Sequence, residues 1–386
     1  MRIGVDLSSL KFPLTGVGNY TYYLLEALLR NPRAPTIEGF QGLSWRSIKP
    51  QYFERSPSKD RPVSTLKDAV GLGWLREHER ARQLYTSFRR KVFEASAAAK
   101  SIMLFHAFSF VPPGHLAVPT IPVVYDLSFV RHPDLHPRAR VRALQAIEMH
   151  LQSAPVIHTI SRFSANEITN IYGIEPSRIA IIYPGVKPIF TRPSLNSSAV
   201  LARYKLTAGE YFLVVSTLEP RKNLRTLVSA YLNISPALRG QFPLCVVGAA
   251  GWNDMDLPDG YENLERAGSL RFLGFVPDAE LKALYENARV MLYPSSYEGF
   301  GMPIIEALAS GTPVACSNTT SLPEAGGTVS RSVAPFDVDA WAEELRHAAD
   351  QSLSQHKQAR QAHALQFTWD RAAEQALDLY AKVLNR

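Results

Sequence analysis

The segment Tyr297-Glu298-Gly299-Phe300-Gly301-Met302-Pro303-Ile304-Ile305-Glu306 places seven residues between two carboxylates, Glu298 and Glu306. The apolar run before it, residues 288–295, predicts a buried strand that ends at a proline. The run after it, residues 304–310, predicts a helix with Pro303 at its first position, where a missing N–H costs nothing. Glu298 is therefore expected on the loop at the carboxyl end of the strand, and Glu306 about one turn into the helix.

The backbone between the two glutamates has a chemistry of its own. The N–H groups of Phe300, Gly301 and Met302 fall at the start of the helix, where they have no intrahelical partner and can hold an anion. A carboxylate accepts hydrogen bonds from sugar or ribose hydroxyls while such amides hold a phosphate. The combination suits a nucleotide-sugar. An isolated pair of glutamates would be explained more simply as the solvated ends of an ordinary strand–helix turn.

The whole segment, through Gly311-Thr312-Pro313-Val314-Ala315, resembles the donor-site signature of retaining glycosyltransferases of family 4. The resemblance implies an α/β chain with the GT-B fold, in which two Rossmann-like domains with parallel sheets face a central cleft. It also implies transfer of a hexosyl unit from a nucleoside-diphosphate sugar with retention at the anomeric carbon. In that family the leaving phosphate assists the transfer, so no side chain is expected to act as a covalent nucleophile.

The order of elements along the chain agrees with this class of fold. Short β-branched runs alternate with helical patterns, which predicts parallel sheets covered by helices. Pro, Gly, Ser and Asn accumulate over 183–198 and predict a domain boundary. We expect an acceptor-side domain over 1–190, a donor domain over 191–366, and a C-terminal helix over 367–386 that can cross back to the first domain. The expected strands are 3–7, 102–105, 122–125, 156–160, 179–182, 211–216, 244–247, 270–273, 290–293 and 314–316, and the clearest helices are 19–30 and 369–384.

Composition narrows the class of protein further. The chain has 386 residues, of which 46% are apolar, enough for two well-filled cores. No apolar run approaches the length that spans a bilayer, and residues 1–6 predict a first strand rather than a secretory signal. Only Cys245 and Cys316 occur, both in strand-like runs, so neither a disulfide framework nor a cysteine zinc site is expected. A cytoplasmic location is the natural inference.

The net charge of +7 is compatible with several anionic partners: nucleic acid, a membrane surface or a diphosphate donor. Basic residues concentrate in the first half, most densely over 76–100 and 138–142. Within 74–93 they alternate with apolar side chains near helical spacing, an arrangement that can lie in a lipid interface. A helix packed on the first domain, with a solvated charged face, explains the same pattern. We favour peripheral attachment to the inner face of the cytoplasmic membrane, because a lipid-linked acceptor would require it, and we expect no nucleic-acid partner.

The segment 216–223 follows a predicted strand and carries Arg221 and Lys222. At that position they could neutralise a diphosphate and stabilise it as it leaves. The segment resembles the Glu-Pro-Arg-Lys-Asn motif of the same family, whose basic residues hold the donor diphosphate. Many members have an arginine six positions before the lysine, where this chain has Ser216.

The first half contributes fewer residues. Gly16 and Gly18 lie in a loop that resembles the glycine-rich first loop of the family, which implies contact with the donor. His106 ends a predicted strand, and the resemblance assigns it an active-site role, although a lone histidine is more often structural. Many relatives have a histidine before Asp126, where this chain has Tyr125, a residue that cannot become a cation. Tyr125 and Asp126 are assigned to the acceptor side.

Two further expectations complete the site. The backbone of Val276 matches the family position that meets the nucleotide base. Asp254 and Asp256 lie in a polar loop without a supporting histidine or third carboxylate, so we expect no metal and no cofactor besides the donor. The expected catalytic residues are Glu298, Arg221, Lys222 and His106, and the expected donor-binding residues are Gly16, Gly18, Val276, Phe300, Gly301, Met302 and Glu306.

The segments 217–223 and 126–133 look most like bacterial mannosyl- or rhamnosyltransferases of surface-polysaccharide and lipopolysaccharide assembly. That resemblance favours a GDP-linked over a UDP-linked sugar and implies a glycan or lipid-linked oligosaccharide acceptor. A nucleotide-dependent oxidoreductase is a rival from another class, but no Gly-x-Gly-x-x-Gly directly follows the first strand. The non-enzymatic rival is a basic scaffold for membrane or nucleic acid.

Overall fold

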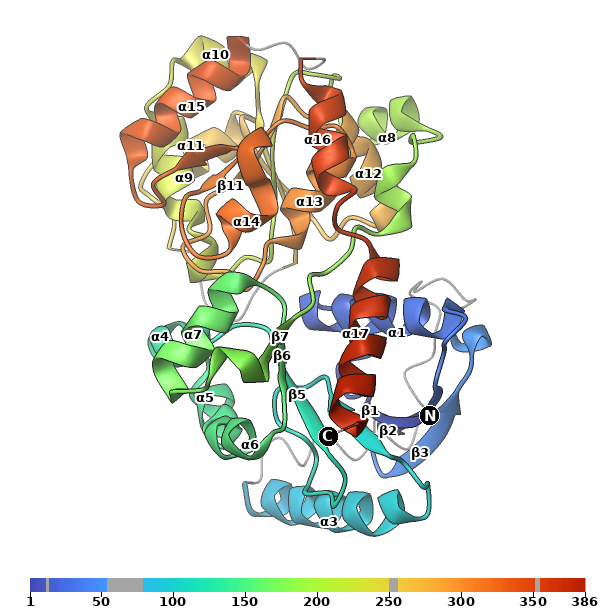
Figure 1. The fold of residues 1–386 in the computed structure, drawn as a ribbon. Coiled ribbons are helices and arrows are strands. Elements are labelled where there is room, and N and C mark those ends of the chain that lie inside the picture. Colours follow the sequence, from blue (N-terminus) through green and yellow to red (C-terminus); the bar gives the residue numbers. More distant parts are fainter. Residues whose placement is uncertain (12–13, 54–78, 250–255, 351–354, 386) are drawn as a thin grey trace.

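The protein has two α/β lobes that face each other (Figure 1). The computed structural model describes residues 1–11, 14–53, 79–249, 256–350 and 355–385. The first lobe is built from the N-terminal half of the chain together with the last helix. The second lobe contains the intervening residues. The two Rossmann-like domains expected from the sequence are therefore present.

The first lobe contains a sheet whose seven described strands have the order β3-β2-β1-β4-β5-β6-β7. All neighbours are parallel except β2 and β3, which form an antiparallel hairpin at one edge. The strands are β1 (Arg2–Asp6), β2 (Thr36–Gln41), β3 (Ser44–Ile48), β4 (Leu104–Ala107), β5 (Thr120–Val124), β6 (Ile157–Thr159) and β7 (Ile179–Ile181). Val5 lies opposite His106, so the carboxyl ends of β1 and β4 are level with each other.

The second sheet is fully parallel over its six described strands, in the order β10-β9-β8-β11-β12-β13. The strands are β8 (Phe212–Val215), β9 (Leu244–Val247), β10 (Leu270–Gly274), β11 (Val290–Tyr293), β12 (Val314–Ser317) and β13 (Arg331–Val333). The central strands β8, β9, β11 and β12 are buried on both faces, as expected where helices cover a parallel sheet from two sides. The order changes direction between β8 and β11, and ligands bind at such switch points in open α/β sheets.

Helices connect the strands of both sheets. In the first lobe these are α1 (Gly16–Arg30), α3 (Glu79–Ala98), α4 (Ser128–Arg131), α5 (Arg138–Leu144), α6 (Ile147–Ser153) and α7 (Arg162–Tyr172). In the second they are α8 (Ser197–Arg203), α9 (Leu224–Leu232), α10 (Pro236–Gln241), α11 (Tyr261–Arg266), α12 (Asp278–Asn287), α13 (Met302–Ala309), α14 (Leu322–Gly326), α15 (Val338–Asp350) and α16 (Lys357–Ala364). Short 3-10 turns occur at Pro50–Tyr52, Pro133–Leu135, Pro176–Arg178, Pro188–Thr191, Pro220–Lys222 and Gly327–Val329, and the chain ends in α17 (Trp369–Leu384).

Helix starts follow local capping chemistry. Ser161 Oγ accepts from the N–H of Ser164 at the start of α7, and Thr368 Oγ1 accepts from the N–H of Arg371 at the start of α17. Thr15 caps α1 in the same way, so this helix begins at Gly16, three residues earlier than the expected helix 19–30. Gly16 and the buried Gly18 therefore belong to the first turn of a helix rather than to a loop.

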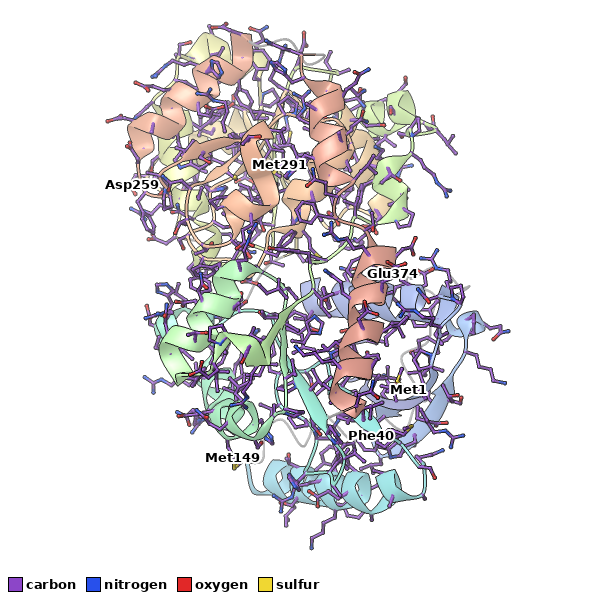
Figure 2. All side chains as sticks on the ribbon, viewed as in Figure 1. Met1, Phe40, Met149, Asp259, Met291 and Glu374 are labelled. Atoms are coloured by element: carbon purple, nitrogen blue, oxygen red, sulfur yellow. The ribbon has the colours of Figure 1, made fainter. Side chains whose placement is uncertain are left out.

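The last helix returns from the second lobe to the first and packs against α1 (Figure 1). The ring of Trp369 stacks on Tyr23 at 5.7 Å between centroids, and Tyr380 is fully buried. Side chains fill the space between each sheet and its helices, and the largest core cluster runs through both lobes (Figure 2). Two chain crossings thus join the lobes, at 182–187 and 365–368, and they touch where the N–H of Val186 donates to Phe367 O (3.0 Å).

Candidate active site

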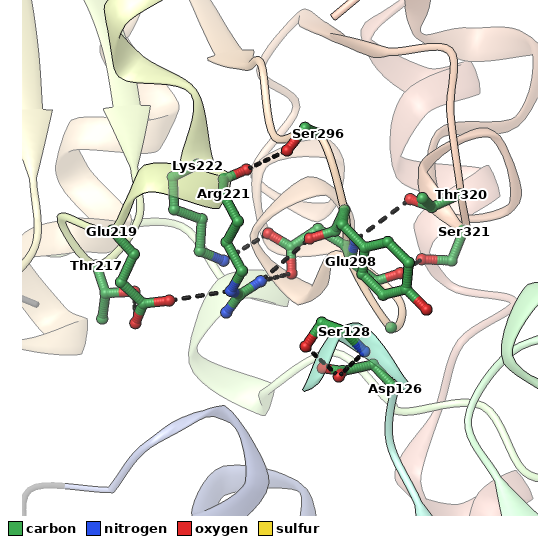
Figure 3. Close-up of polar contacts among 12 residues, drawn as sticks. Asp126, Ser128, Thr217, Glu219, Arg221, Lys222, Ser296, Glu298, Thr320 and Ser321 are labelled. Atoms are coloured by element: carbon green, nitrogen blue, oxygen red, sulfur yellow. Dashed lines mark hydrogen bonds and ion pairs between the residues drawn. The ribbon is translucent and has the colours of Figure 1, made fainter. Parts of the chain in front are cut away.

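Glu298 lies at the centre of a buried ion cluster in the second lobe (Figure 3). Its Oε2 accepts from Arg221 (2.9 Å), and its Oε1 accepts from Lys222 and from the Tyr293 hydroxyl (2.9 Å). Three elements supply these groups: the turn after β8, the end of β11 and the loop that follows it. The structure thus brings together the three charged residues that two separate motifs predicted.

The cluster fixes the charge of each member. Burial alone would raise the pKa of Glu298, but the attraction of Lys222 and Arg221 holds it at about 2. Burial and the neighbouring Arg221 lower the pKa of the Lys222 ammonium. Glu298 is therefore ionised at neutral pH, and it adds stability that is lost only as the pH falls from about 4.5 through about 2.

A second carboxylate, that of Glu219, binds the Nε side of the Arg221 guanidinium. Glu219 Oε2 accepts from Arg221 Nε (3.0 Å), and Glu219 Oε1 accepts from the Thr217 hydroxyl (2.8 Å). The main chain is fixed as well, because Ser296 donates to the carbonyl of Arg221 through both its N–H (2.9 Å) and its hydroxyl (3.1 Å). The guanidinium is oriented before any ligand arrives, which is what electrostatic preorganisation requires.

Glu306 belongs to a separate buried cluster on α13, beside the connection between the lobes. Lys187 Nζ lies 3.6 Å from Glu306 Oε1 and 3.1 Å from both carboxylate oxygens of Asp278. One ammonium thus serves two carboxylates, with Asp278 the closer. Burial, opposed by Lys187 and reinforced by Asp278, raises the pKa of Glu306 to about 7.

The turn between the two glutamates is shaped to present amides. Gly301 has φ of 101°, a left-handed conformation that favours glycine, and α13 starts at the next residue. Within the described part of the chain, the N–H groups of Phe300, Gly301 and Met302 make no hydrogen bond. An added Cβ on Gly16 would lie 3.7 Å from Met302 Cε, so the start of α1 borders this turn. Gly18 instead faces Ser9 and Leu14, and Val276 is buried between β10 and α12.

The first lobe reaches the cluster through the end of β5. Gly299 is packed so closely that an added Cβ would lie 2.2 Å from Tyr125 O and 3.2 Å from the Cβ of Asp126. Asp126, beside the Glu298 loop in Figure 3, accepts from Ser128 through both the N–H (3.0 Å) and the hydroxyl (2.6 Å). Burial lowers the pKa of Arg221, but the attraction of Glu298 and then of Asp126 outweighs burial and raises it above its usual range. Asp126 is therefore an electrostatic neighbour of Arg221 across the two lobes.

Two residues assigned to the site from sequence lie in the core of the first lobe. His106 is fully buried, with Nδ1 hydrogen-bonded to the Tyr380 hydroxyl (2.7 Å) and Nε2 to His158 (2.9 Å). Burial and then His158 lower its pKa well below the usual value, so it stays neutral. The Tyr125 side chain is buried, and its hydroxyl donates to Phe108 O (3.0 Å). The polar atoms of both side chains are therefore hydrogen-bonded within the first lobe.

Other charged residues near the site were given no role from the sequence. Lys187 lies between Pro184 and Pro188, and Glu219 directly precedes Pro220. Only the fold shows which carboxylate or cation each of them meets. His136 is buried, and its pKa is lowered by burial, Arg140 and Arg221, whereas the negative charge of Asp126 opposes the lowering. The two His-Pro pairs after β5 could have drawn attention to it.

The described residues contain neither a cluster of metal-binding side chains nor a membrane-spanning helix. In the part of the chain that the structure describes, no group of three or more His, Cys, Asp or Glu side chains could hold a metal ion. Of the two aspartates considered from sequence, Asp256 pairs with Arg225 at the surface, and Asp254 lies outside the described residues. None of the helices searched, all within the described ranges, is long and apolar enough to cross a membrane.

Comparison with known sequences points to one family. A sequence model described as Glycosyl transferases group 1 matches residues 204–364. The O-antigen chain mannosyltransferase B of Escherichia coli is 34% identical over 384 residues, which cover 98% of this chain and 99% of that protein. The serotype-specific mannosyltransferase WbdA of Escherichia coli is 28% identical over 61% of this chain and 29% of its own length.

Solved structures share the fold. WaaG, a glycosyltransferase involved in lipopolysaccharide biosynthesis, superposes with a TM-score of 0.67 over 98% of this chain and 99% of its own, at 18% identity. HepE of Anabaena, in complex with UDP-glucose, gives a TM-score of 0.69 over 99% of this chain and 100% of its own, at 17% identity. The expected two-domain architecture is thereby confirmed.

Proposed function

Since the chain belongs to the group 1 glycosyl transferases, we propose that it is a retaining mannosyltransferase that uses GDP-mannose and extends a glycan carried on a lipid. Membership of the family excludes the oxidoreductase and the non-enzymatic scaffold considered from sequence. The observation that carries the proposal is the buried cluster of Arg221, Lys222 and Glu298 in a chain similar over its whole length to an O-antigen chain mannosyltransferase.

The leaving group is a nucleoside diphosphate, so negative charge grows on its phosphate oxygens in the transition state. That charge would be stabilised by positive groups whose positions are already fixed: the side chains of Arg221 and Lys222 and the N–H groups from Phe300 to Met302. Both cations already have ordered partners, which reduces the reorganisation needed when the donor binds.

Glu298 would accept hydrogen bonds from hydroxyls of the transferred sugar. A carboxylate with a pKa of about 2 is a poor proton donor and a weak nucleophile at neutral pH. This supports a route in which no covalent sugar–enzyme bond forms and the leaving phosphate itself assists the acceptor. Glu306 would accept from the ribose hydroxyls in its ionised form, and the backbone of Val276 would meet the base.

The acceptor would approach from the first lobe, past the carboxyl end of β5. Asp126 is the acceptor-side residue that we retain, because it lies at that strand end and within electrostatic range of Arg221. Its position suits orientation of an attacking hydroxyl.

We further propose that the diphosphate is balanced by Arg221 and Lys222 without a divalent cation. Two cationic side chains supply the charge that a bound metal ion provides in other phosphate sites. Full activity in EDTA is expected, and loss of activity that only added metal restores would contradict this.

A lipid-linked acceptor would bring the enzyme to the inner face of the cytoplasmic membrane. On α3, Leu84 and Phe88 are 72% and 56% exposed, one turn apart, and the exposed Arg90 and Lys91 flank them. Such a face combines apolar burial with attraction to anionic headgroups. Trp74, Leu75 and Arg76, which belong to the same sequence pattern, lie outside the described residues.

Incubation of the purified protein with labelled GDP-mannose and a lipid-linked mannosyl acceptor tests the function. The expected product carries a new mannosyl unit with the α-anomeric configuration of the donor, observable by NMR. UDP-glucose, UDP-galactose and ADP-glucose serve as matched donors. Transfer from a UDP-sugar but not from GDP-mannose would replace the proposed donor, and an inverted anomeric centre would refute retention.

A further inference from the structure

The first helix turn of α7 is held by a carboxylate from the other lobe. Glu324 on α14 accepts from the N–H of Arg162 (2.9 Å, to Oε2) and the N–H of Phe163 (2.7 Å, to Oε1). These are the first two amides of α7, which have no intrahelical partner. The Tyr183 hydroxyl, on the connection between the lobes, donates to the same Oε2 (3.0 Å). One side chain of the second lobe thus completes a helix of the first.

The same helix also contacts the loop that carries Glu298. Tyr297, the residue directly before it, is 4% exposed, and its ring packs edge-on against Phe163 at 5.4 Å between centroids. Its hydroxyl donates to Glu167 Oε2 (3.3 Å), and Arg131 fixes the Glu167 carboxylate through two hydrogen bonds of 2.8 and 2.7 Å.

A third contact lies between these two. The Ser164 hydroxyl, in the first turn of α7, lies 3.1 Å from Tyr125 O and 3.5 Å from Gly299 O. The helix therefore touches α14, the Glu298 loop and the end of β5, and Figure 1 shows it at the boundary between the lobes.

We propose that Glu324 and Tyr297 are positioning residues for the transfer reaction, which set the Glu298 loop against the first lobe through α7. The inference rests on the proposed function in one respect, namely that Glu298 meets the donor sugar while the acceptor lies on the first lobe. Glu324 contacts neither substrate, and its action passes through the helix.

The contact of Glu324 with α7 is of a kind that can form and break as the two lobes approach and separate. The partners of Glu324 are two backbone amides, the Tyr183 hydroxyl and the exposed Arg162 guanidinium (Nε 3.8 Å from Oε2), and water can satisfy all of them when the lobes separate. The Glu324 side chain is 15% exposed, so water reaches it without disruption of either core. The cationic residues assigned to the diphosphate all lie in the second lobe, so loss of the contact should spare nucleotide binding and slow transfer.

The experiment compares Glu324→Gln with wild type and with Glu343→Gln, an exposed glutamate on α15 of the same lobe. Glutamine keeps the size of the side chain, but it carries no charge and has a single acceptor oxygen for two N–H groups. We expect kcat to fall about tenfold, equivalent to about 1.4 kcal/mol, with the Kd for GDP changed less than twofold. Amide exchange of Arg162 and Phe163 should accelerate, whereas Glu343→Gln should change none of these.

Tyr297→Phe provides an independent variant, because it removes only the contacts of the hydroxyl with Glu167 and with the backbone of Leu127, both in the first lobe, and keeps the packed ring. Its kcat should fall with unchanged GDP affinity. An unchanged kcat in both variants, or a loss of GDP affinity as large as the loss of kcat, would overturn the inference. Absence of transfer by the wild-type enzyme would instead count against the proposed function, whereas the exchange and GDP-binding measurements report on the contact without any turnover.

Discussion

At the scale of single residues, the site is a balance between one carboxylate and two cations. Glu298 is the counterion of both Arg221 and Lys222; Glu298 and Lys222 are buried, and the Arg221 side chain is 16% exposed. Removal of one partner from such a group leaves uncompensated charge and costs about 3–5 kcal/mol. A donor diphosphate offers the same two cations an alternative counterion. The residue that orients the sugar therefore also holds the charges that receive the phosphates.

Glu298→Gln should accordingly abolish transfer and lower the melting temperature of the free protein. Added GDP should raise the melting temperature of this variant by more than it raises that of wild type, because the diphosphate no longer competes with Glu298 for Arg221 and Lys222. Thermal unfolding with and without GDP measures both effects, and Glu343→Gln is the control. Near-normal turnover, or a smaller GDP effect than in wild type, would contradict the assignment.

Glu306 leads to a prediction about pH. Its pKa of about 7 means that it keeps a proton in the folded protein between pH 4.5 and 7, so its ionisation costs stability as the pH rises through that range. Only the ionised form accepts hydrogen bonds from both ribose hydroxyls. The affinity for GDP should therefore increase up to about tenfold from pH 6 to pH 8.

Calorimetric titration of Glu306→Gln over the same pH range supplies the control. The phosphates of GDP titrate in both proteins, so the difference between the two pH profiles belongs to Glu306. Parallel profiles would show that its ionisation does not affect nucleotide binding.

The residues of the cluster were predictable from sequence because each lies in a motif tied to a strand end. Because β8 and β11 are neighbours in the sheet, the motifs that follow these two strands lie side by side. The place of His106 was not predictable, because it depends on Tyr380, a residue 274 positions away. A strand-end histidine has the same sequence appearance whether it faces a ligand or the returning last helix.

At the scale of elements, the Glu298 loop packs so tightly against the end of β5 that Gly299 has no room for a side chain. Gly299→Ala would place a methyl group 2.2 Å from Tyr125 O, against backbone that cannot move aside alone. The expected result is a loss of transfer of at least tenfold with GDP binding retained, because the added methyl group forces the lobes apart. Steady-state kinetics and GDP titration measure the two effects.

Gly240→Ala is the matched control for this substitution. Gly240 lies on α10, where an added Cβ would meet nothing within 4 Å. There alanine should leave activity intact and stabilise the helix by about 0.5–1 kcal/mol. Equal kinetics for the two variants would contradict a tight contact between the Glu298 loop and the first lobe.

Elements with strong apolar runs were predicted within a few residues. Strands β9 and β11 and helix α17 have the expected bounds. The hairpin of β2 and β3 was missed, because the edge strand β3 is mostly exposed and has no buried run to reveal it. The start of α1 was predicted three residues too late, because Gly16 and Gly18 are typical of a loop although they form the first helix turn, which Thr15 caps. Local sequence encodes burial and capping, but edge pairing depends on the neighbouring strand.

At the scale of the whole molecule, the exposed face of α3 should bind anionic membranes. Met149, at the edge of the same lobe in Figure 2, adds a further side chain that is 66% exposed. Leu84→Ser with Phe88→Ser should reduce binding to vesicles that contain phosphatidylglycerol at least tenfold, with activity on soluble acceptors unchanged. Flotation at low and moderate salt measures the effect, because screening weakens the electrostatic part.

Leu195→Ser is the control for membrane binding, since Leu195 is fully exposed on the second lobe. If wild-type protein does not bind anionic vesicles even at low salt, the proposed membrane association is wrong. Equal binding by the double variant and wild type would instead place the contact elsewhere on the protein.

The return of α17 to the first lobe sets an order of events during synthesis. The last strand of the first sheet ends at Ile181, but the core that contains Tyr23 and His106 is closed only by Trp369 and Tyr380. A ribosome needs roughly 10–40 s to add the residues between these points. During that interval the apolar surface of the first lobe beside α1 is exposed to solvent, while the second lobe emerges from the ribosome and folds. Nascent chains of this protein should therefore depend on chaperones until α17 has left the ribosome and packed on the first lobe.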